Sequence, residues 1–444
     1  MMNRFRIVPV LALAFVLAGC SWFGSSDSDK ISAKELAKAI PVLAGVQKIQ
    51  PDAALAGTKP EVPAPVANKD WPQPGYDVSH MMPDAALAAN PQKIWSSDIG
   101  SGSDDNYKLL AQPVVAQGLV YTMDAEGGIT AFDAATGDQK WDFDTTPEDA
   151  DNSAMGGGLA YAGGTLYATT GFGEVIALNA ASGHVEWRHK LGNPVRGAPT
   201  VAGGQVYALS IDDDVHALDV HDGNELWHHN GIDEVATLMG ASSPALAGDS
   251  VIVAYASGEV YDLRPENGRA DWNYTLSMPT HMGALPAIAD IRGLPVVDHG
   301  DVFAASHSGR MAAIDQRTGG RVWEADIGGV DTPLVAGDTV FLIADDHQLV
   351  ALTRDSGRVI WAQTLQSLSD PTDHDSDRVF WVGPVLAGGK LWLANSLGQV
   401  RSFSAADGHQ LGKIHLSEPI FIAPVVANGI MYVVLNDGTL VALR

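Results

Sequence analysis

A repeated pairing of glycine with tryptophan constrains the fold of this chain more than any other feature. In each copy an apolar stretch enters a polar turn, and a Trp follows the Gly of that turn by four positions. Gly supplies the positive φ that a tight hairpin turn requires. The six copies are Gly137/Trp141, Gly183/Trp187, Gly223/Trp227, Gly268/Trp272, Gly319/Trp323 and Gly357/Trp361. A seventh turn, at Gly408, has Gly412 in the Trp position.

Each of these hairpins has a similar lead-in. An apolar burst that usually opens with Pro comes first, as at residues 113–118, 199–204 and 333–337, and a second apolar strand follows it. Pro is tolerated at the first residue of a strand. Four short strands in roughly 40–50 residues is the period of a propeller blade. One such blade cannot bury both of its faces, whereas neighbouring blades stacked around an axis can.

The two ends of the chain complement each other. The last three strands, within residues 424–444, lack an outer strand, and residues 92–97 supply a candidate for it. Trp95 precedes Trp141 by 46 residues, the same spacing that separates Trp141 from Trp187. We therefore predict an all-β, eight-bladed β-propeller of four-stranded blades. An N-terminal strand completes the last blade and closes the ring, which removes exposed sheet edges.

Composition agrees with one large all-β domain and narrows the range of partners. The 47 Gly and 24 Pro residues suit many turns, and a hydrophobic content of 46% is ample for a core. The formal net charge of -26 argues against nucleic acid as a partner, because that requires a basic surface. The excess of acidic residues has two open interpretations: it keeps the protein soluble, or it forms an acidic docking face.

The first residues are typical of an export signal. Residues 1–19 combine a basic start with an apolar stretch too short to be a comfortable membrane span. Their last three residues and Cys20 form a Leu-Ala-Gly-Cys sequence that resembles the lipobox of bacterial lipoproteins, so Cys20, the only cysteine, is the expected lipid attachment site. Residues 20–75 are expected to form a flexible tether with a short helix and a Pro-rich spacer, and residues 76–444 the propeller.

Lipobox, tether and Trp-bearing repeats together resemble the BamB family, lipoprotein propellers of the outer-membrane β-barrel assembly machinery. The resemblance implies repeats of the type found in pyrroloquinoline-quinone dehydrogenases. It also implies a non-enzymatic scaffold without a cofactor, anchored by lipid in the outer membrane and facing the periplasm. The expected partner is a BamA-like protein, bound through its periplasmic repeats, and the expected role is to aid assembly and insertion of β-barrel proteins.

By register, the partner contacts of that family fall on two loops of this chain, residues 236–244 and 286–295. Leu238 and Asp290 stand where the family has an apolar and an acidic contact. Met239 replaces an expected Arg, and Arg292 replaces an expected acid, so the contact is rearranged or the partner geometry differs. The other reading of these loops is that they are ordinary connections between blades.

Other stretches also carry residue types found in sites. A quinone- or calcium-binding periplasmic enzyme is the rival class, but a single cysteine excludes the vicinal cysteine pair of quinone dehydrogenases. The acidic run at residues 373–377 departs from the EF-hand pattern, which leaves a solvated loop or weak calcium binding. Residues 278–282, with Met at both ends, indicate either a partner surface or packing at the mouth of a blade.

Overall fold

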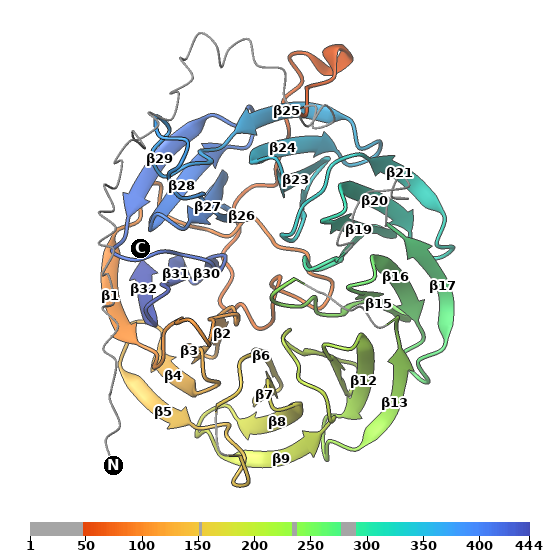
Figure 1. Cartoon of the computed structure of the whole chain (residues 1–444), viewed down its shortest axis with the longest axis vertical. Helices are drawn as coiled ribbons and strands as arrows, with labels where there is room; N and C mark the ends of the chain where they lie inside the picture. The colour runs from red at the N-terminus through yellow and green to blue at the C-terminus, as the bar shows by residue number, and fades with distance from the viewer. Residues whose placement is uncertain (1–47, 151–152, 233–237, 277–289) are drawn as a thin grey trace, which may run out of the picture. The chain divides into compact units, whose positions relative to one another are not determined.

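The computed structural model describes residues 48–444 except 151–152, 233–237 and 277–289. Residues 48–444 form a compact unit of their own. Within the described residues the strands form eight antiparallel four-stranded sheets arranged in a ring (Figure 1). The predicted eight-bladed β-propeller is therefore confirmed.

Blades 1 to 4 follow the chain from their innermost to their outermost strand. Their bounds are β2 (Val114–Ala116), β3 (Leu119–Met123), β4 (Ile129–Asp133) and β5 (Gln139–Phe143); β6 (Gly157–Ala162), β7 (Thr165–Thr170), β8 (Glu174–Asn179) and β9 (Val185–Lys190); β10 (Thr200–Ala202), β11 (Gln205–Leu209), β12 (Asp214–Asp219) and β13 (Glu225–Asn230); β14 (Ala245–Ala247), β15 (Ser250–Ala254), β16 (Glu259–Leu263) and β17 (Ala270–Thr275).

Blades 5 to 8 continue in the same order, and blade 8 takes its outermost strand from the N-terminal side of the ring. Their bounds are β18 (Val296–Asp298), β19 (Asp301–Ser306), β20 (Arg310–Asp315) and β21 (Arg321–Ala325); β22 (Leu334–Ala336), β23 (Thr339–Ala344), β24 (Gln348–Thr353) and β25 (Val359–Thr364); β26 (Trp381–Ala387), β27 (Lys390–Asn395), β28 (Gln399–Ser404) and β29 (Gln410–His415); β30 (Val425–Ala427), β31 (Ile430–Val434), β32 (Thr439–Leu443) and β1 (Lys93–Asp98).

Burial changes across each blade as its position in the ring requires. The inner strand β2 is buried throughout, whereas the outer strand β5 keeps exposed residues along its length. Pro113 directly precedes β2, as the lead-in pattern predicts. In blade 7 the pattern differs, because β26 begins before Pro384 and the register is irregular between Val382 and Val385.

The N-terminal strand closes the ring as predicted. β1 pairs antiparallel with β32, and Trp95 stands opposite Ala442. Just outside that ladder, Gln92 N donates to Arg444 O at 2.7 Å and Arg444 N donates to Gln92 O at 2.8 Å. The first and last strands of the propeller therefore share one sheet, and neither presents the edge that it would have in an open ring.

The repeated Trp and Gly residues interlock neighbouring blades. Trp187 of blade 2 lies on Gly223 of blade 3, where a Cβ would be 2.5 Å from the indole ring. Its Nε1 donates to Val220 O in the same turn, at 2.9 Å. The φ of Gly223 is 71°, so both the backbone and the lack of space require Gly. Equivalent contacts join Trp95 to Gly137, Trp141 to Gly183, Trp227 to Gly268, Trp272 to Gly319, Trp323 to Gly357 and Trp361 to Gly408.

This interlock explains why one repeat lacks its Trp. Gly412 of blade 7 stands opposite Ser402, in the position that Trp takes elsewhere. The next blade is blade 8, where the turn that would receive a Trp is replaced by the junction of Arg444 with Gln92. Because that junction is the break between the chain's first and last strands, it offers no turn Gly for an indole ring.

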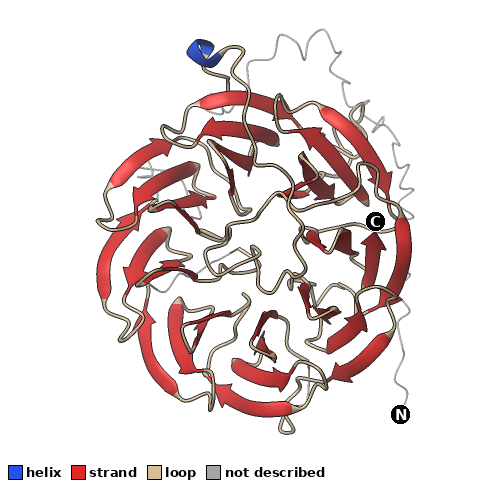
Figure 2. Cartoon of the chain, turned by 180° about the vertical axis from the view of Figure 1, so that it is seen from behind, coloured by secondary structure: helices blue, strands red, loops and turns tan. Residues whose placement is uncertain are grey.

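An inner loop, residues 66–86, runs around the middle of the ring (Figure 2). From Asn68 to Ala85 its hydrogen bonds reach blades 8, 1, 2, 3, 4, 5 and 7 in that order, on the inner strand or, for His80, on the connector before it. The contacts are Asn68 with blade 8, Trp71 with blade 1, Pro72 with blade 2, Gln73 with blade 3, Val78 with blade 4, Ser79 and His80 with blade 5, and Ala85 with blade 7. The circuit closes on itself, because Val66 N donates to Asp84 O and Ala86 N donates to Val66 O, both at 2.8 Å.

The residues before the inner loop lie along blade 6. Ile49 N donates to Gln348 Oε1 at 2.9 Å, Asp52 N donates to Val359 O at 2.8 Å, and the short 3-10 helix η1 (Ala53–Leu55) follows. From the sequence we expected an extended spacer over residues 57–75. That stretch is irregular, with turns at both ends, and its backbone and side-chain groups bond to the propeller. Bonds to the blades lie on both sides of the expected boundary at residue 75, at Gln73 and at Val78.

Candidate functional site

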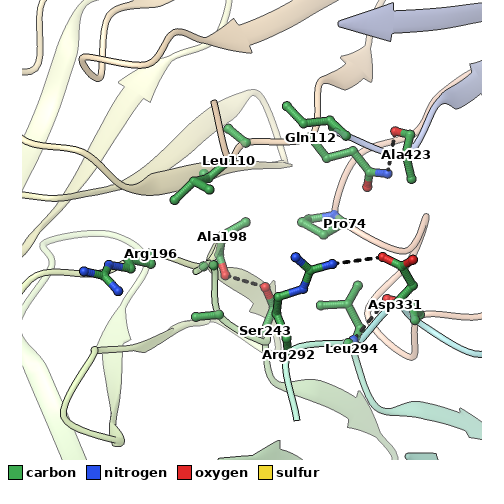
Figure 3. A pocket seen from close by; sticks show the side chains of 18 of the residues that line it. Pro74, Leu110, Gln112, Arg196, Ala198, Ser243, Arg292, Leu294, Asp331 and Ala423 are labelled. Atoms are coloured by element: carbon green, nitrogen blue, oxygen red, sulfur yellow. Dashed lines mark hydrogen bonds and ion pairs between the residues drawn. The ribbon is translucent and has the colours of Figure 1, made fainter. Parts of the chain in front are cut away.

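A cavity of about 190 Å³ lies at the centre of the ring (Figure 3). Its walls are mostly the connectors, the loops that lead from the outer strand of one blade to the inner strand of the next. Pro74 of the inner loop also lines it. The cavity therefore has walls from the connectors and a contribution from the inner loop. Because the connectors vary in sequence while the blades repeat, they are the part of the propeller that can differ in function.

Two of the predicted site residues lie on the 3–4 connector, which joins β13 to β14 and is described at residues 231–232 and 238–244. Leu238 is half-buried, and Met239 is 47% exposed and lines the cavity. An unbranched, flexible apolar side chain is thus exposed at this position. The preceding residues of the expected loop, 236–237, lie outside the described residues.

Asp290 begins the described part of the 4–5 connector, residues 290–295, which leads into β18. Its side chain is 5% exposed, and Oδ2 accepts a hydrogen bond from Leu238 N at 2.6 Å. Burial raises the pKa of this carboxyl, although the bond from Leu238 and the charge of Arg292 oppose the shift. The family resemblance assigns Asp290 an acidic contact with a partner, and that role stays a prediction. In the structure its carboxylate lies between the two connectors and joins them.

Arg292 reaches across the cavity from the same connector. Nη2 lies 3.0 Å from Asp331 Oδ1, and Nε donates to Val330 O at 3.2 Å (Figure 3). Burial raises the pKa of Asp331 to about 6 despite the neighbouring guanidinium. The stem of Arg292 packs beside Gly240, where a Cβ would be 3.4 Å from Arg292 Cδ. Arg292 is therefore held in one place beside Met239.

Hydroxyl side chains tie the connectors to one another around the cavity. Ser243 Oγ donates to Ala198 O at 2.8 Å, and Ser242 Oγ donates to Gly293 O at 3.2 Å. Leu294 N in turn donates to Thr332 Oγ1 at 3.0 Å. These bonds link four successive connectors, so the four predicted residues are brought together on a cross-braced surface. Both serines donate to backbone carbonyls, so their hydroxyl groups act as braces between the connectors.

Several residues of this site were missed from the sequence. Arg196, Gln112 and Asp331 line the cavity together with Arg292. Arg196 points away from Arg292, so the two guanidinium groups do not converge (Figure 3). Each missed residue lies in a different connector, and no local motif marks them. The only signal in the sequence was their place a few residues before an inner strand.

Exposed aromatic side chains extend the apolar surface near the cavity. Phe421 lines the cavity from the 7–8 connector, and its ring centroid lies 6.4 Å from that of Phe380. Both rings are exposed. Together with Met239 they give this end of the ring apolar groups beside a fixed guanidinium. Such a surface is suited to binding a chain by contact rather than to acid–base chemistry.

Other predicted sites have separate outcomes. Cys20 and residues 278–282 lie outside the described residues. In the acidic run, Asp373 Oδ1 accepts from Asp375 N at 3.0 Å, so this carboxylate closes a local turn. Within the described part of the chain no three His, Cys, Asp or Glu side chains come together to hold a metal ion. Over the same residues no helix has the length and apolar character to span a membrane.

Comparison with known proteins places this ring in a family. A sequence model of the family described as outer membrane protein assembly factor BamB matches residues 86–155, 150–363 and 368–444. A relative of that name from Alkalilimnicola ehrlichii is 38% identical over 355 residues, which are 80% of this chain and 88% of the relative. The relative from Escherichia coli is 31% identical over 358 residues, again 80% of this chain and 88% of the relative.

Solved structures show the same architecture at lower sequence identity. The crystal structure of BamB from Moraxella catarrhalis superposes with a TM-score of 0.68 at 20% identity, covering 80% of this chain and 99% of that one. A quinohemoprotein alcohol dehydrogenase from Comamonas testosteroni gives a TM-score of 0.66 at 15% identity, covering 90% of this chain and 83% of that one. At such identities both show the fold alone. On the match of the family model and the identity to its relatives, the chain belongs to the BamB family of outer membrane protein assembly factors.

Proposed function

We propose that this protein is a non-enzymatic scaffold that aids assembly and insertion of β-barrel proteins at the outer membrane. Its relatives are named outer membrane protein assembly factors. A lipid on Cys20 holds it at the membrane, facing the periplasm. The 3–4 and 4–5 connectors dock the periplasmic repeats of a BamA-like protein, with Leu238 and Met239 as the apolar part of the contact.

The observation that carries this proposal is the pairing of an exposed apolar side chain with a fixed cation. Met239 is exposed at the cavity, and Arg292 is braced beside it by Asp331 and Val330 O. A small specific interface requires a desolvated anchor and a polar rim. Preorganised groups also lose less entropy on binding. Asp290 serves this surface indirectly, because its bond to Leu238 N fixes one connector against the other.

The expected free-energy cost of substitution differs between Met239, the apolar anchor, and Arg292. Truncating an interface anchor costs upwards of about 2 kcal/mol, which is more than tenfold in affinity. Removing Arg292 alone would leave the buried carboxylate of Asp331 without its cation, which destabilises the fold as well as the interface. The double variant Arg292→Gln/Asp331→Asn avoids that uncompensated charge. It therefore tests what the charge of Arg292 contributes to binding, without leaving the Asp331 carboxylate unpaired.

The test titrates a soluble repeat domain of a BamA-like protein into the full mature chain carrying Cys20→Ser. Met239→Ala is compared with Leu226→Ala, because Leu226 is 49% exposed on the outer strand β13, close to the 47% of Met239. We expect Met239→Ala to weaken binding more than about tenfold and Leu226→Ala to leave it unchanged. Equal affinity of the two variants would show that the connectors are not part of the interface.

An enzymatic function is the second candidate, because dehydrogenases share the fold. The cavity lining does not fit a quinone with calcium. Its volume of about 190 Å³ lies below the usual range for ligand pockets, about 300–1,000 Å³. Calcium takes roughly six to eight oxygen ligands. Among the described residues that line this cavity Asp331 carries the only carboxylate, and it is paired with Arg292. Dye reduction by the protein after incubation with pyrroloquinoline quinone, calcium and an alcohol would support an enzymatic function. We expect no dye reduction.

A further inference from the structure

We propose that the turn at residues 75–80 of the inner loop positions the two docking connectors, with His80 as the positioning residue. This inference rests on the proposed function, because it concerns how the same surface is held. Residues 48–85 precede the first residue that the family model matches, residue 86. The turn therefore lies outside the part of the chain that the family model matches, and its role has to be derived from its contacts.

Three consecutive residues of the turn bond to the blades that follow the docking connectors. Val78 O accepts from Leu246 N at 2.6 Å, two residues after the 3–4 connector ends. Ser79 O accepts from Val297 N at 2.9 Å, and His80 Nδ1 lies 2.7 Å from Pro295 O, the last residue of the 4–5 connector. The turn thus spans blades 4 and 5 and fixes the end of one connector relative to the end of the other.

The ring of His80 is suited to a permanent structural bond. Its side chain is 1% exposed, and burial lowers the pKa of the imidazole to about 4, although the bond to Pro295 opposes that shift. The imidazole is therefore neutral at physiological pH. A carbonyl only accepts, so Nδ1 carries the proton and donates to Pro295 O. Substituting a side chain without a donor leaves this buried carbonyl unpaired.

The backbone of the turn is strained in a way that serves this bond. Tyr76 and His80 have φ values of 85° and 62°, which residues other than Gly rarely adopt. Gly75 is required beneath the ring, because a Cβ there would lie 2.8 Å from His80 Cβ. Asp77 Oδ1 braces the turn by accepting from Ser79 N at 2.9 Å and Met81 N at 3.1 Å. Such strain persists where the surroundings determine the conformation, and it often marks a functional constraint.

The inner loop also supplies a matched control. Asn68 is 6% exposed, and its Nδ2 donates to Val426 O of the inner strand β30 at 2.6 Å. Like His80, it is a buried side chain that donates to a backbone carbonyl of the propeller. Blade 8 stands across the ring from blade 4 (Figure 1). Asn68→Ala therefore removes a comparable bond far from the docking connectors.

The experiment compares His80→Ala, His80→Asn and Asn68→Ala in the full mature chain carrying Cys20→Ser. Amide hydrogen exchange is measured over residues 238–244 and 290–295, and affinity is measured for the soluble repeat domain. We expect His80→Ala to speed exchange in both connectors and to weaken binding, each by about tenfold, the factor that loss of one hydrogen bond corresponds to. His80→Asn restores both, because an amide nitrogen replaces Nδ1 and Asn tolerates positive φ.

The outcomes separate this inference from the proposed function. Unchanged exchange in the connectors of His80→Ala, or the same acceleration there in Asn68→Ala, would overturn the positioning role. Faster exchange with unchanged affinity would keep the positioning role and overturn docking at these connectors. If His80→Ala does not fold, His80→Gly removes the same donor without strain at positive φ and gives the same comparison.

Discussion

The interlock between blades predicts that one added methyl group will loosen the ring. In blade 3, Gly223 lies against the indole of Trp187 from blade 2, and a Cβ would meet Cε3 at 2.5 Å. The ring of Trp187 is 8% exposed and is held by its bond to Val220 O, so it has little freedom to retreat. Gly223→Ala must therefore separate the two blades or distort the turn.

The expected cost has two parts that a second variant separates. Placing Ala at a φ of 71° costs about 1–2 kcal/mol, and forcing a methyl group into a packed contact costs about 1–3 kcal/mol more. Gly203, in the first turn of the same blade, has a φ of 61°, but a Cβ there would have no neighbouring atom within 4 Å. Gly203→Ala thus incurs only the first cost.

The assay is urea unfolding at equilibrium, followed by tryptophan fluorescence and fitted with a shared m-value. We expect Gly223→Ala to lose about 2–5 kcal/mol of unfolding free energy and Gly203→Ala about 1–2 kcal/mol. Equal losses in the two variants would show that the Trp contact does not couple the blades. That result would refute the explanation of why the repeat carries Gly and Trp together.

Three further predictions concern closure, pH and the anchor. Deleting residues 92–98 removes β1 and should lower the melting temperature sharply, since the burial of a whole strand is lost; an unchanged melting curve would contradict closure. Because burial raises the pKa of Asp331 from 3.8 to about 6, its contribution to stability is greatest below pH 4 and is lost as pH rises through 6. The unfolding free energy relative to Asp331→Asn should fall by up to about 3 kcal/mol over that range, and a flat difference would refute the assignment. Cys20→Ser should release the protein from washed membranes, and its persistence there would contradict the lipid as the anchor.

The repeat allowed the fold to be predicted closely because its signals are local. Each Gly occupies a turn with positive φ, and each Trp lies on the Gly of the next blade, so a spacing in the sequence reports a contact in space. The closing strand was predictable for the same reason, since Trp95 keeps the spacing of the others. Gly412 looked like a defect in the pattern, and only the ring shows that the blade beyond it has no turn to receive a Trp.

The inner loop could not be predicted from composition. Its three Pro residues are typical of a spacer. Its bonds join backbone and side-chain groups to single residues of separate blades, which leaves no periodicity. The sequence did contain one signal, the two aromatic residues Trp71 and Tyr76 close together. In the structure Trp71 is fully buried and packs edge-on against Tyr76, with 5.4 Å between the ring centroids. A solvated tether has little use for two such aromatic residues so close together.

That the four predicted residues bind a partner stays a prediction. The structure places them on two neighbouring connectors. The burial of Asp290 could not be predicted, because a carboxylate can be displayed or buried and the sequence does not say which. Asp331 was missed since its importance comes from Arg292, 39 residues away in sequence and 3.0 Å away in space.

Site-specific photo-cross-linking in cells tests the central claim most directly. A photoreactive residue in place of Met239 is compared with one in place of Leu226, and the cross-linked proteins are identified by mass spectrometry. We predict that Met239 captures a barrel protein with periplasmic repeats and that Leu226 does not. Capture of that protein equally from both positions, or capture of a soluble electron carrier from Met239, would contradict the claim.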